Sequence, residues 1–480
     1  MIRPLILFDL TRLVSATGRS APTGIERVEY AYARWLLAEP TYHVRFVVTM
    51  KKGIRLIADN AVPAFLDKQA AIWEGGVDAF PADAALRNIN RFLQGHGAPP
   101  APKLGYLSDE ERTMRRNRRR ENGDKPSSPL KAWAQKMASS WTSEPLGPVL
   151  RRSGARRPIV YLRASLDRME WSMPFERLKN AADVRMVVLC HDIIPIDYPE
   201  FVRPNAPRQC AARLDTMNRL ADGVVVSSHY SADRLRAFLA EGGPPLSVAH
   251  LGIAKPEGSA APLPLSELVE EPFFLVVSTI EARKNHVLLL NLWRRFAEEL
   301  GPAAPKLIIA GKRGWEAQTP LAILDRAREL GPSVYEVGAV PDSVLDLLRR
   351  KATAVLMPSF VEGFGMPVME ALAVGTPVLA SDIPVFREIA AEGAALLDPL
   401  DGPSWKEAIM AFSDPSSSRA IHARAAAQRY TPPTWQEHFA AVRDMNRQVL
   451  EDPPCAGKAR WGRKLVAARA ALSRTNSALG

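Results

Sequence analysis

The chain has 480 residues, of which 47% are hydrophobic and 24% charged, a composition typical of globular proteins and not of disordered or fibrous ones. A single hydrophobic core stops growing at about 250–300 residues, so we expect two domains. The net charge is +11, and the three cysteines form no C-x-x-C pair, which argues against a disulfide framework and a cysteine-rich zinc site. The apolar runs are far shorter than the ~20 residues of a membrane span, and the first nine residues lack the features of a signal peptide, so we expect a cytoplasmic protein.

The first half of the chain alternates short apolar runs with amphipathic stretches. Strands are predicted at residues 5–8, 44–48, 159–162, 184–190, 223–226 and 247–250. Helices are predicted at residues 25–37, 206–221 and 231–240. Continuous apolar strands between helices indicate a parallel sheet covered on both faces. We therefore predict a doubly wound, Rossmann-like α/β domain at residues 1–252, with a basic insertion at about residues 100–157.

The same pattern restarts after a proline-rich break at residues 254–271. Strands are predicted at residues 273–278, 306–310, 333–337, 354–357, 377–380 and 394–397. Helices are predicted at residues 285–300, 321–330, 343–350, 367–374, 385–391 and 405–413. These elements predict a second doubly wound domain at residues 253–430. Ligands of such folds bind beyond the carboxyl ends of the strands, so we expect two domains that face each other across a crevice.

Two basic segments carry the positive charge. Residues 103–157 hold 14 Lys/Arg against 6 Asp/Glu, and residues 456–480 hold 6 Lys/Arg and no acid, so the rest of the chain has a net charge of −3. Tryptophans interleave with these cations, which suits an anionic membrane surface, and we hypothesise docking on the inner face of the membrane. The alternative is a solvated, disordered insertion and tail. No nucleic-acid-binding motif accompanies the arginine run at residues 112–120, so we expect no specific nucleic-acid partner.

Several common cofactor motifs are missing from the sequence. No G-x-G-x-x-G follows the first strand of either half, and there is no P-loop, which argues against a dinucleotide cofactor and P-loop chemistry. No H-E-x-x-H, C-x-x-C or Asp-x-Asp spacing indicates a metal site. If a diphosphate binds to this protein, its cations and backbone amides must hold it.

The strongest motif follows the predicted strand at residues 354–357. Glu362 and Glu370 are eight residues apart, and Gly363 and Gly365 permit backbone conformations that other residues avoid. We expect Glu362 in a loop at the strand tip and Glu370 in the first turn of the next helix, where carboxylates can accept hydrogen bonds from sugar hydroxyls. The alternative is a helix-start signature, in which Glu370 interacts favourably with the helix dipole.

This run resembles the Glu-x7-Glu motif of the large retaining glycosyltransferase family 4, which has the GT-B fold. Residues 375–382 and 386–389 are also similar to the family, and the resemblance covers nearly the whole chain apart from the insertion and the tail. It implies that Glu362 contacts the donor sugar, that Glu370 binds the nucleotide ribose, and that the loop with Gly363, Phe364 and Gly365 lies at the donor. It also implies that residues 1–252 form the acceptor side and residues 253–430 bind the nucleotide sugar. A helix at residues 431–452 would then cross back to the first domain, before a basic tail at residues 453–480.

Two cations, Arg283 and Lys284, lie where a helix is predicted to begin. They have the wrong sign for the helix dipole, which costs a few tenths to ~1 kcal/mol unless an anion lies there, and a bound diphosphate would remove the conflict. The alternative is a solvated basic turn. The family usually has Gly-Arg after this strand, whereas this chain has Ser278-Thr279. Arg283 looks like the residue that replaces this arginine in a mannosyltransferase-like branch. Lys312 and Arg313 could also approach the phosphates or be surface residues.

The first domain offers two further candidates. Gly24 and Arg27 lie in a segment that resembles the family's first-domain glycine loop, between a strand and a helix; the alternative is a loop with a helix-capping glycine. His191 follows the predicted strand at residues 184–190. A lone histidine there is more often structural, but the resemblance implies that His191 contacts the donor sugar near the reacting carbon.

The resemblance therefore implies an enzyme, a metal-independent hexosyltransferase with His191 and Glu362 as catalytic residues. It would move a sugar from a nucleoside diphosphate sugar, with GDP-mannose as the first donor to test, to a glycan or lipid-linked acceptor with retention of configuration. No cofactor is expected besides this co-substrate. Two alternatives stay open: a related GT-B epimerase or phosphorylase, and a non-catalytic basic protein that binds membranes or nucleic acid.

Overall fold

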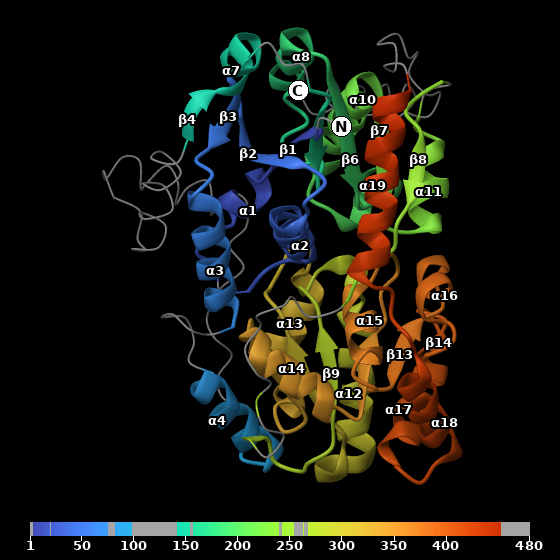
Figure 1. Cartoon of the computed structure of the whole chain (residues 1–480). Helices are drawn as coiled ribbons and strands as arrows, with labels where there is room; N and C mark the ends of the chain where they lie inside the picture. The colour runs from blue at the N-terminus through green and yellow to red at the C-terminus, as the bar shows by residue number, and fades with distance from the viewer. Residues whose placement is uncertain are drawn as a thin grey trace, which may run out of the picture. The chain divides into compact units, whose positions relative to one another are not determined.

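The computed structural model describes residues 3–19, 21–74, 82–97, 142–153, 157–239, 242–253, 263 and 267–452. Most of the predicted basic insertion and the whole tail at residues 453–480 lie outside the described residues. The chain divides into two compact α/β units. Unit 1 comprises Met1–Ala70, Lys125–Ala254 and Pro433–Gly480, and unit 2 comprises Ala71–Asp124 and Lys255–Pro432. The elements of both units are labelled in Figure 1.

Unit 1 contains an eight-stranded sheet in the order β4-β3-β2-β1-β5-β6-β7-β8. Its strands are β1 Leu5–Asp9, β2 His43–Met50, β3 Gly53–Ile57, β4 Thr142–Pro145, β5 Ile159–Arg163, β6 Val184–Cys190, β7 Gly223–Val226 and β8 Leu246–Val248. The predicted parallel strands are confirmed, but β3 and β4 extend the sheet with antiparallel pairs that the apolar pattern does not reveal. A two-residue turn joins β2 to β3, which is the short connection that antiparallel neighbours allow.

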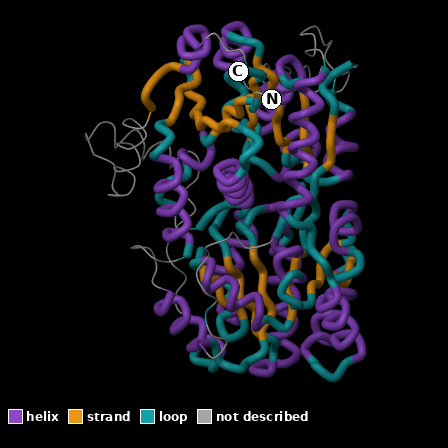
Figure 2. The backbone as a smooth tube through the Cα atoms, viewed as in Figure 1, coloured by secondary structure: helices purple, strands orange, loops and turns teal. Residues whose placement is uncertain are grey.

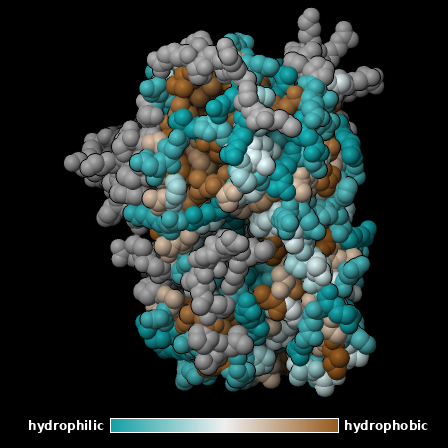
Figure 3. All heavy atoms as spheres, viewed as in Figure 1, coloured by the Kyte–Doolittle hydropathy of each residue, from teal (hydrophilic) through white to brown (hydrophobic). Residues whose placement is uncertain are grey.

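The helices of unit 1 flank this sheet. They are α1 Thr11–Ser15, α2 Gly24–Ala38, α3 Ala61–Trp73, α7 Leu146–Ser153, α8 Ser172–Ala181, α9 Ile194–Asp197, the 3-10 helix η1 Pro199–Phe201, α10 Ala206–Leu220, α11 His229–Arg236 and α19 Trp435–Glu451. Figure 3 shows hydrophobic residues gathered over the part of unit 1 that holds β2 and β3. Among the described residues, no helix is both long and apolar enough to cross a membrane.

Helix α19 returns from the end of unit 2 and packs on β5, β6, β7 and β8 of unit 1. It lies so close to β7 that a Cβ atom at Gly223 would overlap with the sulfur of Met445. His438 fixes the helix, because its Nδ1 donates to the carbonyl of Ala249 at 3.1 Å and its Nε2 accepts from the hydroxyl of Tyr32 at 2.8 Å. Burial lowers the pKa of His438 to about 4, so the ring is neutral and can make both bonds.

Unit 2 contains a six-stranded parallel sheet in the order β11-β10-β9-β12-β13-β14. Its strands are β9 Phe273–Val277, β10 Lys306–Ala310, β11 Val334–Gly338, β12 Ala354–Met357, β13 Val378–Ser381 and β14 Ala394–Leu397. Counted from β9, this is the Rossmann order 3-2-1-4-5-6. The predicted fold class is therefore confirmed in both units, and in unit 2 each predicted strand appears within one residue at either end.

Helices cover both faces of the sheet of unit 2 (Figure 2). They are η3 Ala282–Lys284, α12 His286–Leu300, η4 Gly301–Ala303, α13 Gln318–Arg326, η5 Arg328–Leu330, α14 Asp342–Lys351, α15 Met366–Leu372, α16 Pro384–Ala390, α17 Gly402–Ser413 and α18 Ser418–Arg429. Trp293 of α12 and Trp405 of α17 are fully buried in the core between this sheet and its helices.

Helix α4 (Ala82–Leu93) also packs in unit 2, against α14 and β11, although the sequence placed it in a first domain at residues 1–252. The ring of Phe92 lies 5.3 Å from that of Tyr335. Asn90 donates to the carbonyl of Glu267 at 2.9 Å and accepts from the amide of Val269 at 3.1 Å. The apolar stripe of α4 requires burial, and the sheet of unit 2 provides it.

Candidate active site

The candidate site of unit 2 lies where the strand order reverses. From β9 the chain first adds β10 and β11 on one side and then β12 to β14 on the other, so β9 and β12 are neighbours although they are far apart in sequence. Ligands of open α/β sheets bind at such a switch point, beyond the carboxyl ends of the strands. The loops that leave β9 and β12 meet there, because the amide of Phe360 donates to the carbonyl of Arg283 at 2.9 Å.

Glu362 is the centre of a buried cluster at this point. Its Oε2 lies 2.6 Å from Nη1 of Arg283, and its Oε1 accepts from Nζ of Lys284 and, at 2.7 Å, from the hydroxyl of Ser359. Arg283 also donates to the carbonyl of Val361 at 3.1 Å. The structure thus brings together Arg283, Lys284 and Glu362, three residues that the sequence singled out in two separate motifs.

A second carboxylate, that of Glu281, belongs to the same cluster and was missed in the sequence. Its Oε1 lies 2.8 Å from Nη2 of Arg283, so the guanidinium lies between Glu281 and Glu362. Ser359 was also missed. Both residues lie within three positions of a motif residue on the same short loop, and this proximity was the available signal.

Burial and the neighbouring charges shift the pKa values of the cluster residues in different directions. Burial opposes ionisation of Glu362, but Arg283, Lys284 and two hydrogen bonds together lower its pKa to about 2. Burial and the neighbouring Arg283 lower the pKa of Lys284, and burial raises that of Glu281 despite both cations. At neutral pH the cluster holds two cations against one firmly ionised carboxylate and one carboxylate that is costly to ionise.

The loop after β9 is held against the loop after β10 by two glycines. A Cβ atom at Gly311 would overlap with the carbonyl of Ser278, and one at Gly314 would lie 2.6 Å from the methyl group of Thr279. The structure therefore places Thr279 against the β10 loop.

Arg313 in this loop pairs with Glu336 and Asp325, each at 2.7 Å. Its positive charge is therefore balanced by carboxylates of unit 2.

The glycine loop after β12 has one position that requires glycine. Gly365 has a φ of 97°, and a Cβ atom there would overlap with the ring of Phe386. Phe364 beside it is buried, and Gly363 is half-buried. Helix α15 begins at Met366, so Glu370 lies in its second turn and not, as expected, in its first. The dipole explanation for Glu370 is correspondingly weaker, because the dipole effect falls off within the first turn.

Glu370 has its own partner, which the sequence did not reveal. Its Oε2 lies 2.7 Å from Nη2 of Arg349, a buried residue of α14. The carbonyl of Arg349 in turn accepts from the hydroxyl of Thr376 at 2.7 Å, so the arginine is anchored on both sides. This arrangement orients one edge of the Glu370 carboxylate.

His191 of unit 1 follows β6, as predicted. Its Nε2 lies 2.8 Å from the carbonyl of Ala164, and because a carbonyl only accepts, Nε2 carries the proton. Burial lowers the pKa of His191, and the charge of Arg12 contributes to the shift. The ring is therefore neutral near pH 7 and offers Nδ1 as a hydrogen-bond acceptor.

The predicted glycine loop of unit 1 is organised by other residues than expected. Gly24 is the exposed first residue of α2, and Arg27 is half-buried in its first turn. The left-handed glycine of this loop is Gly18, with a φ of 79°. Glu26 is fully buried, caps α2 by accepting from the backbone, and pairs with Arg19 at 2.7 Å. Glu26 also pairs with Arg12 at 3.1 Å, and this buried acid between two arginines was the missed signal in the loop.

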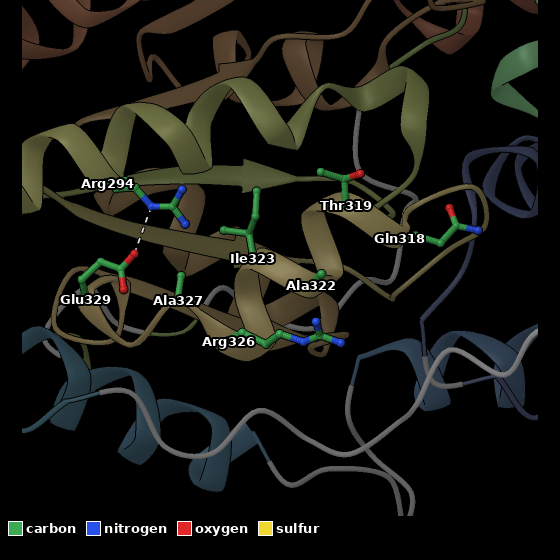
Figure 4. Close-up of a pocket in the computed structure, with 8 residues that line it drawn as sticks. All are labelled: Arg294, Gln318, Thr319, Ala322, Ile323, Arg326, Ala327 and Glu329. Carbon is green, nitrogen blue, oxygen red and sulfur yellow. Dashed lines mark hydrogen bonds and ion pairs between the residues drawn. The ribbon is translucent and has the colours of Figure 1, made fainter.

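Unit 2 also has a shallow depression of about 590 Å³, shown in Figure 4, and no residue of the Glu362 cluster lines it. It is lined by residues of α12, α13 and η5: Arg294, Gln318, Thr319, Ala322, Ile323, Arg326, Ala327 and Glu329. Its ion pair, Arg294 with Glu329 at 3.0 Å, is solvent-exposed on both sides. No candidate residue lines this depression, and it lacks buried opposite charges. We therefore take the switch point, and not the depression, as the candidate site. Within the described ranges, no three His, Cys, Asp or Glu side chains gather as a metal-binding group.

Comparison with known proteins finds similarity between part of this chain and glycosyltransferases. Residues 265–429, most of unit 2, match the family model of glycosyl transferases group 1. The serotype-specific mannosyltransferase WbdA of Escherichia coli is 28% identical over 234 residues, which are 45% of this chain and 28% of WbdA. The O-antigen chain mannosyltransferase RfbU of Salmonella typhimurium is 26% identical over 234 residues, which are 46% of this chain and 59% of RfbU. The chain thus spans less than two thirds of the length of either relative.

A solved structure supports the fold independently of these sequences. The sucrose-phosphate synthase of Thermosynechococcus elongatus gives a TM-score of 0.56 at 15% identity, over 93% of this chain and 99% of that one. This likeness shows a GT-B type of fold, with two Rossmann-like units in one chain. The likeness shows the fold alone, and the similarity to glycosyl transferases group 1 extends over residues 265–429.

Proposed function

We propose that this protein is a glycosyltransferase that moves a sugar from a nucleoside diphosphate sugar to an acceptor alcohol. The observation that carries the proposal is the pair of cations, Arg283 and Lys284, held beside Glu362 at the topological switch point of unit 2. This is the place where a Rossmann-like unit binds a nucleotide. The match of residues 265–429 to glycosyl transferases group 1 covers this unit.

The two cations would act on the leaving group. When the bond between the sugar and the diphosphate breaks, negative charge grows on the diphosphate, and fixed cations stabilise it more in a buried site than in water. Lys284 is only 8% exposed, so its charge is weakly screened. We propose that these side chains do this work without a divalent cation, so that activity persists in EDTA.

The carboxylates would hold the rest of the donor. Glu370, which pairs with Arg349, would accept hydrogen bonds from the ribose hydroxyls, and Glu362 would contact the donor sugar. The neutral imidazole of His191 offers Nδ1 to a sugar hydroxyl. These roles, and retention of configuration, follow the resemblance to family 4 and are part of the proposal.

The substrates are proposed from the relatives. Two of them are named as mannosyltransferases, one of these for an O-antigen chain, which supports GDP-mannose as the first donor to test and a polysaccharide or lipid-linked glycan as the acceptor. A cytoplasmic enzyme that docks on the inner membrane face through its basic segments would reach such an acceptor. Flotation with neutral and anionic liposomes tests the docking, and equal binding to both would argue against it.

The donor proposal is tested by a thermal-shift screen against GDP-, UDP- and dTDP-sugars. A ligand that binds the folded state raises the melting temperature in proportion to the logarithm of its concentration over Kd. The shift should be lost in Lys284→Ala and Glu370→Ala. It should persist in Lys406→Ala, which removes an exposed cation that pairs with Glu299 on the same unit. Unchanged donor affinity in both site variants would refute the proposal.

A further inference from the structure

Glu281 is an unusual side chain for a site that is meant to bind an anion. It is 2% exposed, and Oε1 accepts from Arg283 at 2.8 Å. Within the part of the chain that the structure describes, no group donates a hydrogen bond to its Oε2. A buried oxygen without a donor costs about 1–3 kcal/mol, and more when it is charged. The ionised form of Glu281 therefore depends on Arg283.

The charges around Glu281 are few and can be named. Those that face it are Arg283 and Lys284 of η3 and Glu362 of the loop after β12. The loop after β10 approaches through Gly314. Its Arg313 is paired with Glu336 and Asp325, and the carbonyl of its other cation, Lys312, accepts a hydrogen bond at 2.9 Å from the amide of Ile280, the residue before Glu281. The immediate cluster thus holds two cations and two carboxylates, and its charge is balanced when both carboxylates are ionised.

A diphosphate diester brings two negative charges into this balance. Four negative charges would then face two cations in a site where burial strengthens their repulsion. A buried carboxylate that loses its cation is neutralised by a proton more readily than it is kept ionised. Of the two carboxylates, Glu362 has three donors, namely Arg283, Lys284 and Ser359, whereas Glu281 has Arg283. Glu281 is therefore the carboxylate that loses its cation and takes up a proton.

We propose that Glu281 is a positioning residue for Arg283, and that binding of a nucleoside diphosphate sugar exchanges Glu281 for a phosphate oxygen on the guanidinium. Arg283 stays charged throughout, and the carboxylate of Glu281 takes one proton from the solvent to become a neutral carboxyl group. This inference rests on the proposed function, since it concerns the same diphosphate. It goes further, because it makes donor binding dependent on pH through a residue that does not touch the donor.

The sign of the pH dependence follows from the uptake of a proton. Protons are reactants in binding, so affinity falls as pH rises. Between the pKa of Glu281 in the free protein and its higher pKa in the complex, Kd increases about tenfold per pH unit. Burial raises the pKa of Glu281 already in the free protein, which brings this window closer to neutrality. A residue with only a structural role would leave the pH profile unchanged.

Isothermal titration of the full chain with GDP-mannose and with UDP-glucose tests the proposal. The diphosphate of a nucleotide sugar is a diester without a group that titrates near neutrality, so proton uptake reports the protein. Titrations in three buffers of different ionisation enthalpy, from pH 6 to 8, measure the number of protons. Wild type should take up protons and bind more weakly at pH 8 than at pH 6.

The variant Glu281→Gln keeps the shape and an acceptor for Arg283 but cannot ionise. We expect it to bind the donor without proton uptake, with a flat pH profile and more tightly than wild type at pH 8. The control Glu329→Gln, at an exposed ion pair of the same unit, should keep the wild-type profile. Donor binding by wild type without proton uptake, or uptake that persists in Glu281→Gln and so comes from Lys284, overturns the inference and leaves the proposed function standing. Failure of wild type to bind any nucleotide sugar overturns both, and the wild-type measurement is decisive even if Glu281→Gln does not fold.

Discussion

Replacing Glu362 with glutamine is the sharpest perturbation that the candidate site allows. The change keeps the shape of the side chain and an acceptor for Ser359 but removes the negative charge. Arg283 and Lys284 would then be buried with Glu281 as their remaining carboxylate in the cluster. We expect Glu362→Gln to destabilise the protein at pH 7 and to abolish sugar transfer.

The size of the loss can be estimated in two ways. The surroundings lower the pKa of Glu362 from 4.5 to about 2, and each unit corresponds to 1.36 kcal/mol, which gives about 3 kcal/mol. Removing one partner of a buried ion pair costs about 3–5 kcal/mol in other proteins. Both routes therefore predict a loss of about 3 kcal/mol or more. For a unit of this size each kcal/mol lowers Tm by about 2–4 °C, so a drop of about 6–12 °C is expected.

Thermal unfolding of wild type, Glu362→Gln and the control Glu329→Gln measures this loss. The control removes an equal charge from an exposed pair with Arg294 and should lower Tm little, because exposed ion pairs contribute about 0–1 kcal/mol. GDP-mannose should raise the Tm of Glu362→Gln at least as much as that of wild type, since it returns a negative charge to the cations. A Tm equal to that of wild type would show that Glu362 does not pair with Arg283 and Lys284 in solution.

Three further predictions concern neighbouring residues. Arg349→Ala should weaken nucleotide binding about tenfold, the loss of roughly one charge-assisted hydrogen bond, because Glu370 loses the partner that orients its carboxylate; titration with GDP measures this, and an unchanged Kd would exclude the role. Gly365→Ala should lower the free energy of unfolding in urea by at least ~1 kcal/mol, because φ is 97° and the new methyl group meets Phe386; wild-type stability would contradict the local backbone. Burial lowers the pKa of His286 from 6.5 to about 3. The stability that depends on the neutral imidazole is therefore fully present above pH 6.5 and is lost as pH falls towards 3, by up to about 5 kcal/mol. Urea unfolding between pH 7 and 4 should therefore show a smaller loss in His286→Gln than in wild type, and parallel curves would refute this.

The fold could be predicted from the sequence where a buried element requires a simple apolar pattern. A strand such as β12 (Ala354–Met357), covered on both faces, must be apolar throughout, and the helices between such strands impose a parallel sheet. The pattern failed at the edge strand β4 and at β3 beside it, which are joined to the sheet by antiparallel pairs. It also missed α4 (Ala82–Leu93), for which no helix was predicted, and an apolar stripe would in any case show only that a helix is buried and not which sheet buries it.

The candidate site could be predicted from the sequence only in part, for a related reason. Spacing along the chain placed Glu362 and the two cations each at the tip of a strand, but their contact depends on β9 and β12 being adjacent. That adjacency is a property of the strand order, which brings together loops almost eighty residues apart. Arg349 carries no spacing signal of its own, and the packing of α14 decides what it touches.

The structure also changes the physical meaning of the basic turn before α12. The sequence suggested that Arg283 and Lys284 conflict with the helix dipole and need an anion from outside. The structure shows that Glu362 and Glu281 already supply negative charge at this helix start, so the conflict is largely resolved within the protein. Under the proposed function, binding of a diphosphate would exchange one anionic partner for another, and its affinity would be the difference between two strong interactions. A site of this kind would release a product nucleoside diphosphate readily, because Glu362 and Glu281 can pair with the cations again.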